Sequence, residues 1–231
     1  MKKSISILCC VLLSLSSFAQ VEAYKKNLYQ DPNGFFTVIK PEGWKTSEYS
    51  ETSRGKVKFI NPSNEKINVI IIGEPNPYSS FNDLVTSSKN SDDRMKEKYQ
   101  AYDITVTSKL FTVENIQYTS STITLKKMDK KLLMVDFIIK NTHFSFSYAS
   151  TISSFDTHLS KIYDCIYSLL PSNRKFSDQE ITNALVESKI KQAQFNIQMG
   201  LKDYALKYIE EGLAIDPGNK KLLELKKQIN Q

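Results

Sequence analysis

The sequence predicts an α+β fold, in which an antiparallel sheet built as a meander is flanked by helices and followed by a small all-α helical hairpin. Two observations support this class. Strand patterns dominate from Phe35 to Pro171, and an amphipathic helix closes that region. After the polar segment 172–177, no further strand pattern occurs. The expected organisation is an α/β domain over residues 28–171 and a helical tail over residues 177–231.

The first half of the α/β domain contains three strand-like segments. Phe35–Ile39 is rich in β-branched and aromatic residues and ends at a Pro-Glu-Gly turn. In Gly55–Ile60, Val57 and Phe59 alternate with lysines, which predicts one buried face. Ile67–Ile72 is a continuous apolar run, which predicts a strand covered on both faces.

A helix is expected after the two prolines at 75 and 77. Ser80 can cap it, with Asp83 three residues later, and a loose apolar stripe extends to Tyr99. We expect one helix, with a possible break near Ser91. The acids Asp92-Asp93 beside that break are interpreted as solvated.

Four strands follow in series, and their short polar turns predict an antiparallel meander over residues 103–111, 114–125, 131–140 and 143–150. In the last strand, Phe144 and Phe146 alternate with His143 and Ser145, so His143 is expected on the solvated face. A helix over 154–170 has an apolar stripe and should cover one face of the sheet.

The tail is expected to contain three helices. Residues 177–180 (SDQE) form a capping box that opens a helix extending to about Met199. Gly200 ends this helix, and a second helix extends to about Ile215. The sequence Pro-Gly-Asn then separates it from a final helix.

Residues 193–219 resemble a tetratricopeptide repeat, a helical hairpin that mainly binds other proteins. The resemblance depends on Ala193, the turn residue Gly200, the close-contact residue Ala205 and the closing Asp216-Pro217. Small side chains permit two helices to pack closely, and glycine tolerates the positive φ of a tight reversal. Two positions depart from the family pattern: Gly212, where alanine is usual, and Lys189, where an aromatic residue is usual.

This resemblance implies candidate binding residues on the first helix of the hairpin. Ile190, Gln194 and Gln198 stand where family members present ligand-contacting side chains. The sequence contains one such repeat, whereas a solenoid generally needs three or more. The hairpin must therefore bury its apolar face on the final helix, the α/β domain, a second copy of the chain or a partner.

The α/β domain resembles the PsbP-like fold, a sheet flanked by helices. The residues that carry this resemblance are Phe35–Trp44 (FFTVIKPEGW), where an early strand leads into proline, glycine and tryptophan. The order of elements adds to it. The resemblance implies an accessory or binding role without catalysis, since most members of that fold have such roles.

Residues 1–19 have the layout of a secretory signal. Two lysines precede an apolar run from Ile5 to Leu15, which is well short of the roughly 20 residues that span a bilayer. Small residues precede the expected cleavage site after Ala19, and Ala23 offers a weaker one. We expect export, either to a periplasm or by secretion. Cys9 and Cys10 lie too early for lipidation.

The mature chain would contain a single cysteine, Cys165, and no later segment that could span a membrane. Removal of Lys2 and Lys3 lowers the formal net charge from +6 to +4. The remaining basic residues are spread among 25 acids, so no nucleic-acid partner is expected. Lysines at 126, 127, 130 and 131 form a basic hairpin tip, which we interpret as a solubilising feature or a docking site for an acidic partner or anionic lipid.

No catalytic residue, metal site or cofactor is expected. His158 and Cys165 lie seven residues apart on one helix, about 10 Å along its axis, too far for a shared hydrogen bond. Cys165 is interpreted as a small buried hydrophobe. The chain lacks the spacing of zinc ligands, a calcium loop and a glycine cluster for phosphate.

These observations favour an exported, non-enzymatic interaction or accessory protein whose helical tail mediates docking or self-association. The alternative is an envelope ligand-binding protein with an apolar pocket between sheet and helix. A hydrolase is third, and convergent polar groups around His143 would favour it.

Overall fold

The computed structural model describes residues 26–32, 34–48, 55–171, 178–198 and 200–229. The described residues belong to two compact units, one from Tyr29 to Arg174 and the other containing the helices after Lys175. The expected signal at 1–19, the linker at 172–177 and the capping serine of the tail lie outside the described residues. None of the described helices is long and apolar enough to cross a membrane.

The α/β unit contains nine strands, two α-helices and two short 3₁₀ helices among its described residues. In chain order these are β1 (Leu28–Gln30), β2 (Thr37–Ile39), β3 (Lys45–Glu48), β4 (Gly55–Ile60), β5 (Asn68–Pro75), α2 (Phe81–Lys98), η1 (Gln100–Tyr102), β6 (Ile104–Val113), β7 (Ile116–Leu125), η2 (Lys126–Met128), β8 (Lys130–Ile139), β9 (Thr142–Ser150) and α3 (Phe155–Tyr167).

Seven of these strands form an antiparallel sheet in the order β3-β4-β5-β9-β8-β7-β6. The predicted α+β class and the meander from β6 to β9 are confirmed. Two strands were not expected from the sequence: β1, which pairs with β2 in a separate two-stranded sheet, and β3, which forms one edge of the large sheet.

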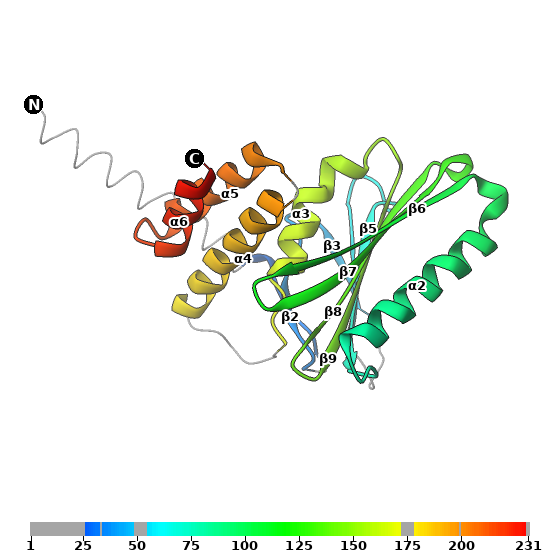
Figure 1. The fold of residues 1–231 in the computed structure, drawn as a ribbon, viewed down its shortest axis with the longest axis horizontal. Helices are drawn as coiled ribbons and strands as arrows, with labels where there is room; N and C mark the ends of the chain where they lie inside the picture. Colours follow the sequence, from blue (N-terminus) through cyan, green and yellow to red (C-terminus); the bar gives the residue numbers. More distant parts are fainter. Residues whose placement is uncertain (1–25, 33, 49–54, 172–177, 199, 230–231) are drawn as a thin grey trace, which may run out of the picture. The chain divides into compact units, whose positions relative to one another are not determined.

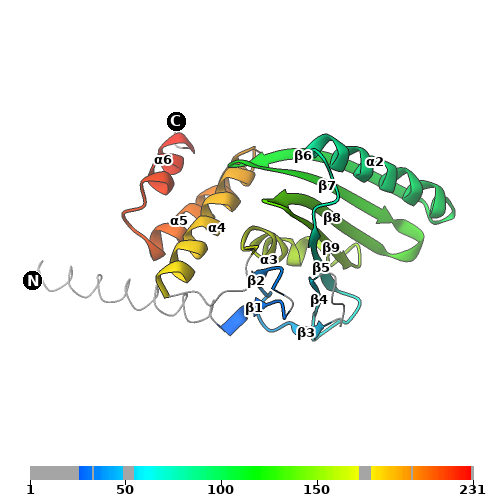
Figure 2. The ribbon, with the colours of Figure 1, turned by 90° about the horizontal axis from the view of Figure 1, so that it is seen from below.

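The large sheet lies between two helices, with α3 on one face and α2 on the other (Figures 1 and 2). The face beside α3 carries the apolar core of the unit. Its aromatic side chains include Phe59, Phe144 and Phe146, which are almost completely buried. Val57 and Phe59 alternate inward as predicted, because this face of β4 is packed against the core.

The β2 region is hydrogen-bonded to the segment that directly follows α3. Thr37 and Leu170 exchange two backbone hydrogen bonds of 2.8 and 2.9 Å, and Ser168 Oγ accepts from Ile39 N at 3.0 Å. Trp44 follows a turn at Gly43, where φ is 78°, and its ring packs edge-on against His158. The N-terminal strands therefore hold the closing helix in place.

The prediction for α2 needs two corrections. Its N-terminus is as expected, since Ser80 Oγ accepts a hydrogen bond from Asp83 N at 3.2 Å. The helix is continuous through Ser91, however, and Asp92 is buried instead of solvated. The cause of both errors is the same: α2 turns polar residues toward the sheet.

The C-terminal unit consists of α4 (Asp178–Gln198), α5 (Lys202–Ile215) and α6 (Lys220–Ile229). The three helices share a hydrophobic core, made by Val186, Ile190, Ala193, Ala205, Tyr208, Ile209, Leu222, Leu225 and Ile229. Because α6 contributes three of these side chains, the α4–α5 hairpin buries its apolar face within its own unit.

Candidate functional site

The α2 face of the sheet is polar along much of its length, in contrast to the apolar α3 face. Strand pairing aligns Ser121 of β7 with Met134 of β8, and Thr119 with Asp136. It also aligns Asp136 with Ser145 of β9. These side chains share one face because residues directly opposite in an antiparallel pair point the same way. Polar positions of β7 and β8 on this face, where the sequence pattern suggests exposure to solvent, thus lie beneath α2.

His143 of β9 lies on the same face of the sheet, and the expectation that it is exposed is wrong. Its side chain is 7% exposed and lies between two carboxylates. Nδ1 lies 3.2 Å from Glu74 Oε1 of β5, and Nε2 lies 3.3 Å from Asp136 Oδ1 of β8. The Tyr78 ring packs edge-on against the imidazole at 5.1 Å between centroids. Glu74 is directly opposite His143 in the sheet register, a pairing that periodicity alone does not reveal.

The charge of His143 follows from this arrangement. Burial alone would lower the pKa of the imidazole, but the close approach of the Asp136 and Glu74 carboxylates outweighs it and raises the pKa above its ordinary value. The protonated form of the ring therefore persists to higher pH in the folded protein than in a free imidazole. Both ring nitrogens face carboxylates and the ring is buried, so neither nitrogen is open to take a proton from a substrate, and His143 is poorly placed to act as a general base.

Asp92 is the second buried polar group of this layer. It is 5% exposed, and its Oδ2 accepts hydrogen bonds from Ser108 Oγ at 2.6 Å and Ser121 Oγ at 2.7 Å. Asp92 follows Leu84 by eight residues, so both lie on the inward side of α2. That spacing was available in the sequence and would have indicated burial.

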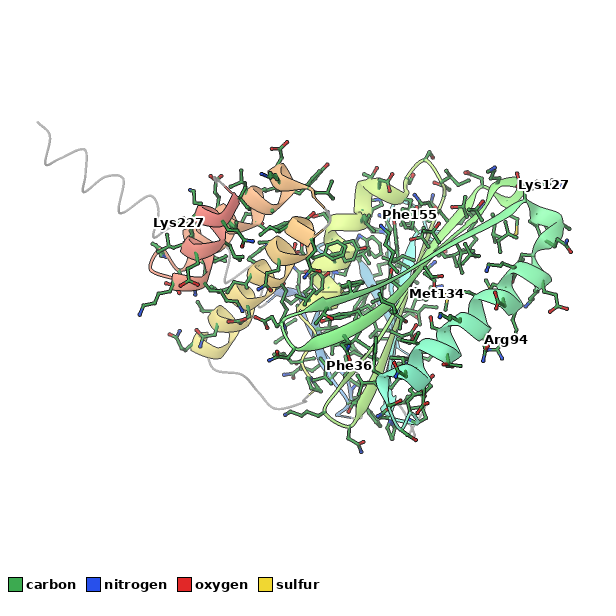
Figure 3. The ribbon with its side chains drawn as sticks, in the orientation of Figure 1. Phe36, Arg94, Lys127, Met134, Phe155 and Lys227 are labelled. Carbon is green, nitrogen blue, oxygen red and sulfur yellow. The ribbon has the colours of Figure 1, made fainter. Side chains whose placement is uncertain are left out.

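Two cavities adjoin Asp92, one on each side. The larger has a volume of about 150 Å³ and is lined by residues that include Tyr78, Asp92 and Asp136. The smaller has about 110 Å³ and is lined by residues that include Asp92 and Ser108. Figure 3 labels Arg94 on α2 and Met134 on the sheet, two of the residues that line the larger cavity.

The remaining candidate residues for catalysis do not join this layer. Cys165 is a free thiol, completely buried on α3, and burial raises its pKa, so it has little thiolate character. The interpretation of Cys165 as a buried hydrophobe is confirmed. His158 packs against Trp44 instead. Within the described residues, no group of three or more His, Cys, Asp or Glu is placed to hold a metal ion.

The candidate binding residues of the tail differ in their surroundings. Ile190 is 1% exposed and belongs to the core of the three-helix unit. Gln194 is half-buried and Gln198 is exposed. A ligand-contacting face on α4 would therefore depend on the two glutamines.

The positions that carry the repeat resemblance have the geometry of a tightly packed hairpin. Gly200 has a φ of 72°. Its N–H donates to Ile197 O, and the N–H of Leu201 donates to Asn196 O, so both hydrogen bonds end on the last turn of α4. A Cβ at Gly212 would lie 2.6 Å from Leu222 Cδ1. Lys189, which stands where the repeat family usually has an aromatic residue, forms an ion pair with Glu211 at 2.8 Å between Nζ and Oε2.

The basic hairpin tip is largely engaged by its own unit. Lys126 pairs with Asp103 at 3.4 Å, and Lys127 Nζ donates to Ala101 O at 3.0 Å. Lys131 Nζ lies 3.6 Å from Asp156 and 4.3 Å from the centroid of the Phe155 ring. These contacts support a structural role for three of the four lysines.

Comparisons with known proteins find similarity in structure only. No protein-family profile matches the sequence, and no curated protein does. The solution structure of cyanobacterial PsbP (CyanoP) from Synechocystis sp. PCC 6803 is similar at 17% identity and a TM-score of 0.47, covering 62% of this chain and 91% of that chain. A crystal structure from Bacteroides thetaiotaomicron VPI-5482 is similar at 16% identity and a TM-score of 0.37, covering 85% and 73%. Both TM-scores are below 0.5 and both identities are below 25%, so neither likeness assigns a family, an activity or a ligand to this chain.

Proposed function

We propose that this chain is an exported, non-enzymatic interaction or accessory protein, and that its helical tail mediates docking or self-association. The mature protein would begin after Ala19 and act in a periplasm or outside the cell. Residues 28–171 would form its α/β domain, and residues 177–231 would form a tetratricopeptide-like docking module.

The observation that carries this proposal is the closed core of the three-helix unit. Since α6 covers the hairpin, no outside surface is needed to bury the hairpin's apolar stripe. Side chains that still face outward are then available for a partner. Tyr204 is 58% exposed at the start of α5, and Leu201 is exposed in the turn before it. Exposed aromatic residues are frequent anchors of protein interfaces.

The polar layer of the α/β unit supports the absence of catalysis in this proposal. Both ring nitrogens of His143 face carboxylates, and Asp92 accepts hydrogen bonds from two serine hydroxyls. An apolar ligand pocket between the sheet and its closing helix has less support. Aromatic side chains of the core, among them Tyr118, Phe137 and Phe144, occupy the α3 face of the sheet.

Substitution of Tyr204 tests the proposal with a matched control. Tyr204→Ser removes an exposed ring from the tail, and Tyr102→Ser removes an exposed ring from the α/β unit. Loss of an interface anchor typically costs about 2 kcal/mol or more, roughly thirtyfold in affinity. Sedimentation velocity and affinity capture on the exported protein should show weaker association for Tyr204→Ser alone. Equal association of both variants and the parent protein would contradict the role of this surface.

A further inference from the structure

The cavity of about 150 Å³ between α2 and the sheet is built from polar groups on both of its walls. Serines 87 and 91 line it from α2, and Ser121 lines it from β7. Two carboxylates face it from opposite sides, Asp92 on α2 and Asp136 on β8. A helix packed on a sheet normally buries an apolar stripe. At this contact between α2 and the sheet, polar side chains occupy part of that stripe, so less apolar surface is buried.

The charges around the cavity leave an excess of one negative charge. Asp136 and Glu74 share the single cation of His143. Asp92 accepts hydrogen bonds from the hydroxyl groups of two serines. These donors are neutral, so they do not balance the negative charge of the carboxylate. Arg94, an exposed residue of α2, also lines the cavity and supplies one further cation. Among the residues that line the cavity, two carboxylates, Asp92 and Asp136, thus face one cation, Arg94.

Asp136 lines the cavity from β8 and also lies beside His143. Nε2 of His143 lies 3.3 Å from Asp136 Oδ1, yet it has no hydrogen-bond partner in suitable geometry, although the imidazole is more than nine-tenths buried. The contact of Asp136 with His143 is therefore one of charge attraction without hydrogen-bond geometry, and the same carboxylate also lines the cavity. An ammonium group can donate three hydrogen bonds to acceptors of this kind.

From this geometry we infer that the cavity between α2 and the sheet is a binding site for a small molecule with a primary ammonium group. Asp92 and Asp136 would accept from the ammonium, and the serine hydroxyls would bind a neighbouring polar group of the ligand. A cavity of this volume holds a molecule of roughly six heavy atoms, the size of benzene. The site is independent of the helical tail and of the function proposed for it.

Ethanolamine is a suitable probe, with ethylene glycol as its neutral counterpart of the same size. In an ¹⁵N–¹H NMR titration of the mature protein at about pH 7, ethanolamine should give saturable shifts of amides that line the cavity. Ethylene glycol should bind at least about tenfold more weakly, because it lacks the charge that complements the two carboxylates.

Three variants separate binding at this cavity from nonspecific attraction of a cation. Asp92→Asn removes the charge but keeps an oxygen that can accept from both serines, and Ser91→Leu fills the cavity without a change of charge. Both should weaken ethanolamine at least about tenfold. Asp93→Asn is the matched control, since its side chain is 71% exposed and pairs with Lys96, and it should bind as the parent does.

The inference is overturned if ethanolamine gives no saturable shifts, if ethylene glycol binds equally well, or if Asp92→Asn and Ser91→Leu both bind like Asp93→Asn. The NMR spectra of the unliganded variants report folding in the same experiment. If the spectrum of one variant lacks the dispersion of a folded protein, the binding result of the other variant decides.

Discussion

Substitution of Gly212 by valine tests the packing of the helical unit. A Cβ at this position would lie 2.6 Å from Leu222 Cδ1 and 3.2 Å from Lys189 Cβ. The leucine terminus can rotate away, but Lys189 Cβ is attached to the α4 backbone, so α4 and α5 must move apart. Overpacking of this kind costs about 1 to 3 kcal/mol, and the better helix propensity of valine over glycine returns about 0.4 kcal/mol. We expect a net loss of about 1 to 2 kcal/mol.

The chain offers a way to assign this loss to one unit. Trp44 is the only tryptophan of the sequence and is buried in the α/β unit, so its fluorescence follows that unit. Circular dichroism at the helical band follows both units. For a small unit, the expected loss lowers the melting temperature by roughly 5 to 15 °C. This lower melting temperature should appear in the circular dichroism of Gly212→Val. The melting temperature followed by Trp44 fluorescence should be the same as in the parent protein.

Gly218→Val is the control for this experiment, because a Cβ at Gly218 would have a single neighbour, Asp216 Oδ1 at 3.8 Å. It should melt close to the parent protein. If Gly212→Val is as stable as Gly218→Val, then α4, α5 and α6 do not approach one another as closely as the structure indicates, and the argument from small residues fails.

Three further predictions concern the α/β unit and the N-terminus. Since the pKa of His143 is raised in the folded protein, its contribution to stability is present below about pH 6.5 and is lost as the pH rises through the folded value. Urea unfolding followed by Trp44 fluorescence should show this decline above pH 6.5, and His143→Gln should flatten it; a parent curve that rises there would refute the assignment. Asp92→Ala should cost about 1 to 3 kcal/mol by leaving two serine hydroxyls without their acceptor, whereas the exposed Asp93→Ala should stay within about 0.5 kcal/mol. Intact-mass measurement of the exported protein should give a chain that begins at Gln20, and a retained N-terminus or an added lipid mass would contradict the export prediction.

The pH window is chosen because the two histidines act in opposite directions. Burial and the nearby charge of Lys161 lower the pKa of His158, so its contribution to stability is lost on acidification below about pH 6.5. The decline between pH 6.5 and about 8 therefore reports on His143, because the raised pKa of the buried Cys165 thiol adds a decline only at higher pH. Tyr118, Tyr148 and Tyr163 titrate above this window, since burial raises the pKa of each of them.

The sequence was informative wherever local chemistry decides the structure. Alternation in Gly55–Ile60, the cap at Ser80 and the glycine at 200 depend on neighbours in the chain, and the structure has each as expected. The short strand β3 was missed because its sequence, KTSE, has no apolar alternation. It forms a strand because β4 offers a partner.

The polar layer was missed for a different reason. Periodicity indicates which side chains share a face of a sheet, but not what covers that face. His143 and Ser145 were correctly placed on one face, but the Tyr78 ring packs on His143, and α2 covers the neighbouring strands β6 to β8. The same limit applies to β5, whose continuous apolar run suggested burial on both sides. In the structure Val69 and Ile71 are buried, whereas Ile70 and Ile72 are only half-buried.

The central proposal is that interactions of this protein depend on its helical tail. Affinity capture of the tagged, exported protein from its own envelope, with and without residues 177–231, tests it most directly when an untagged copy is also expressed. We predict that truncation removes one specific co-purifying protein, or the untagged copy, while the Trp44 transition of the α/β unit is retained. An unchanged set of captured proteins, with the α/β unit still folded, would contradict the proposal and move the interaction surface to the sheet and its helices.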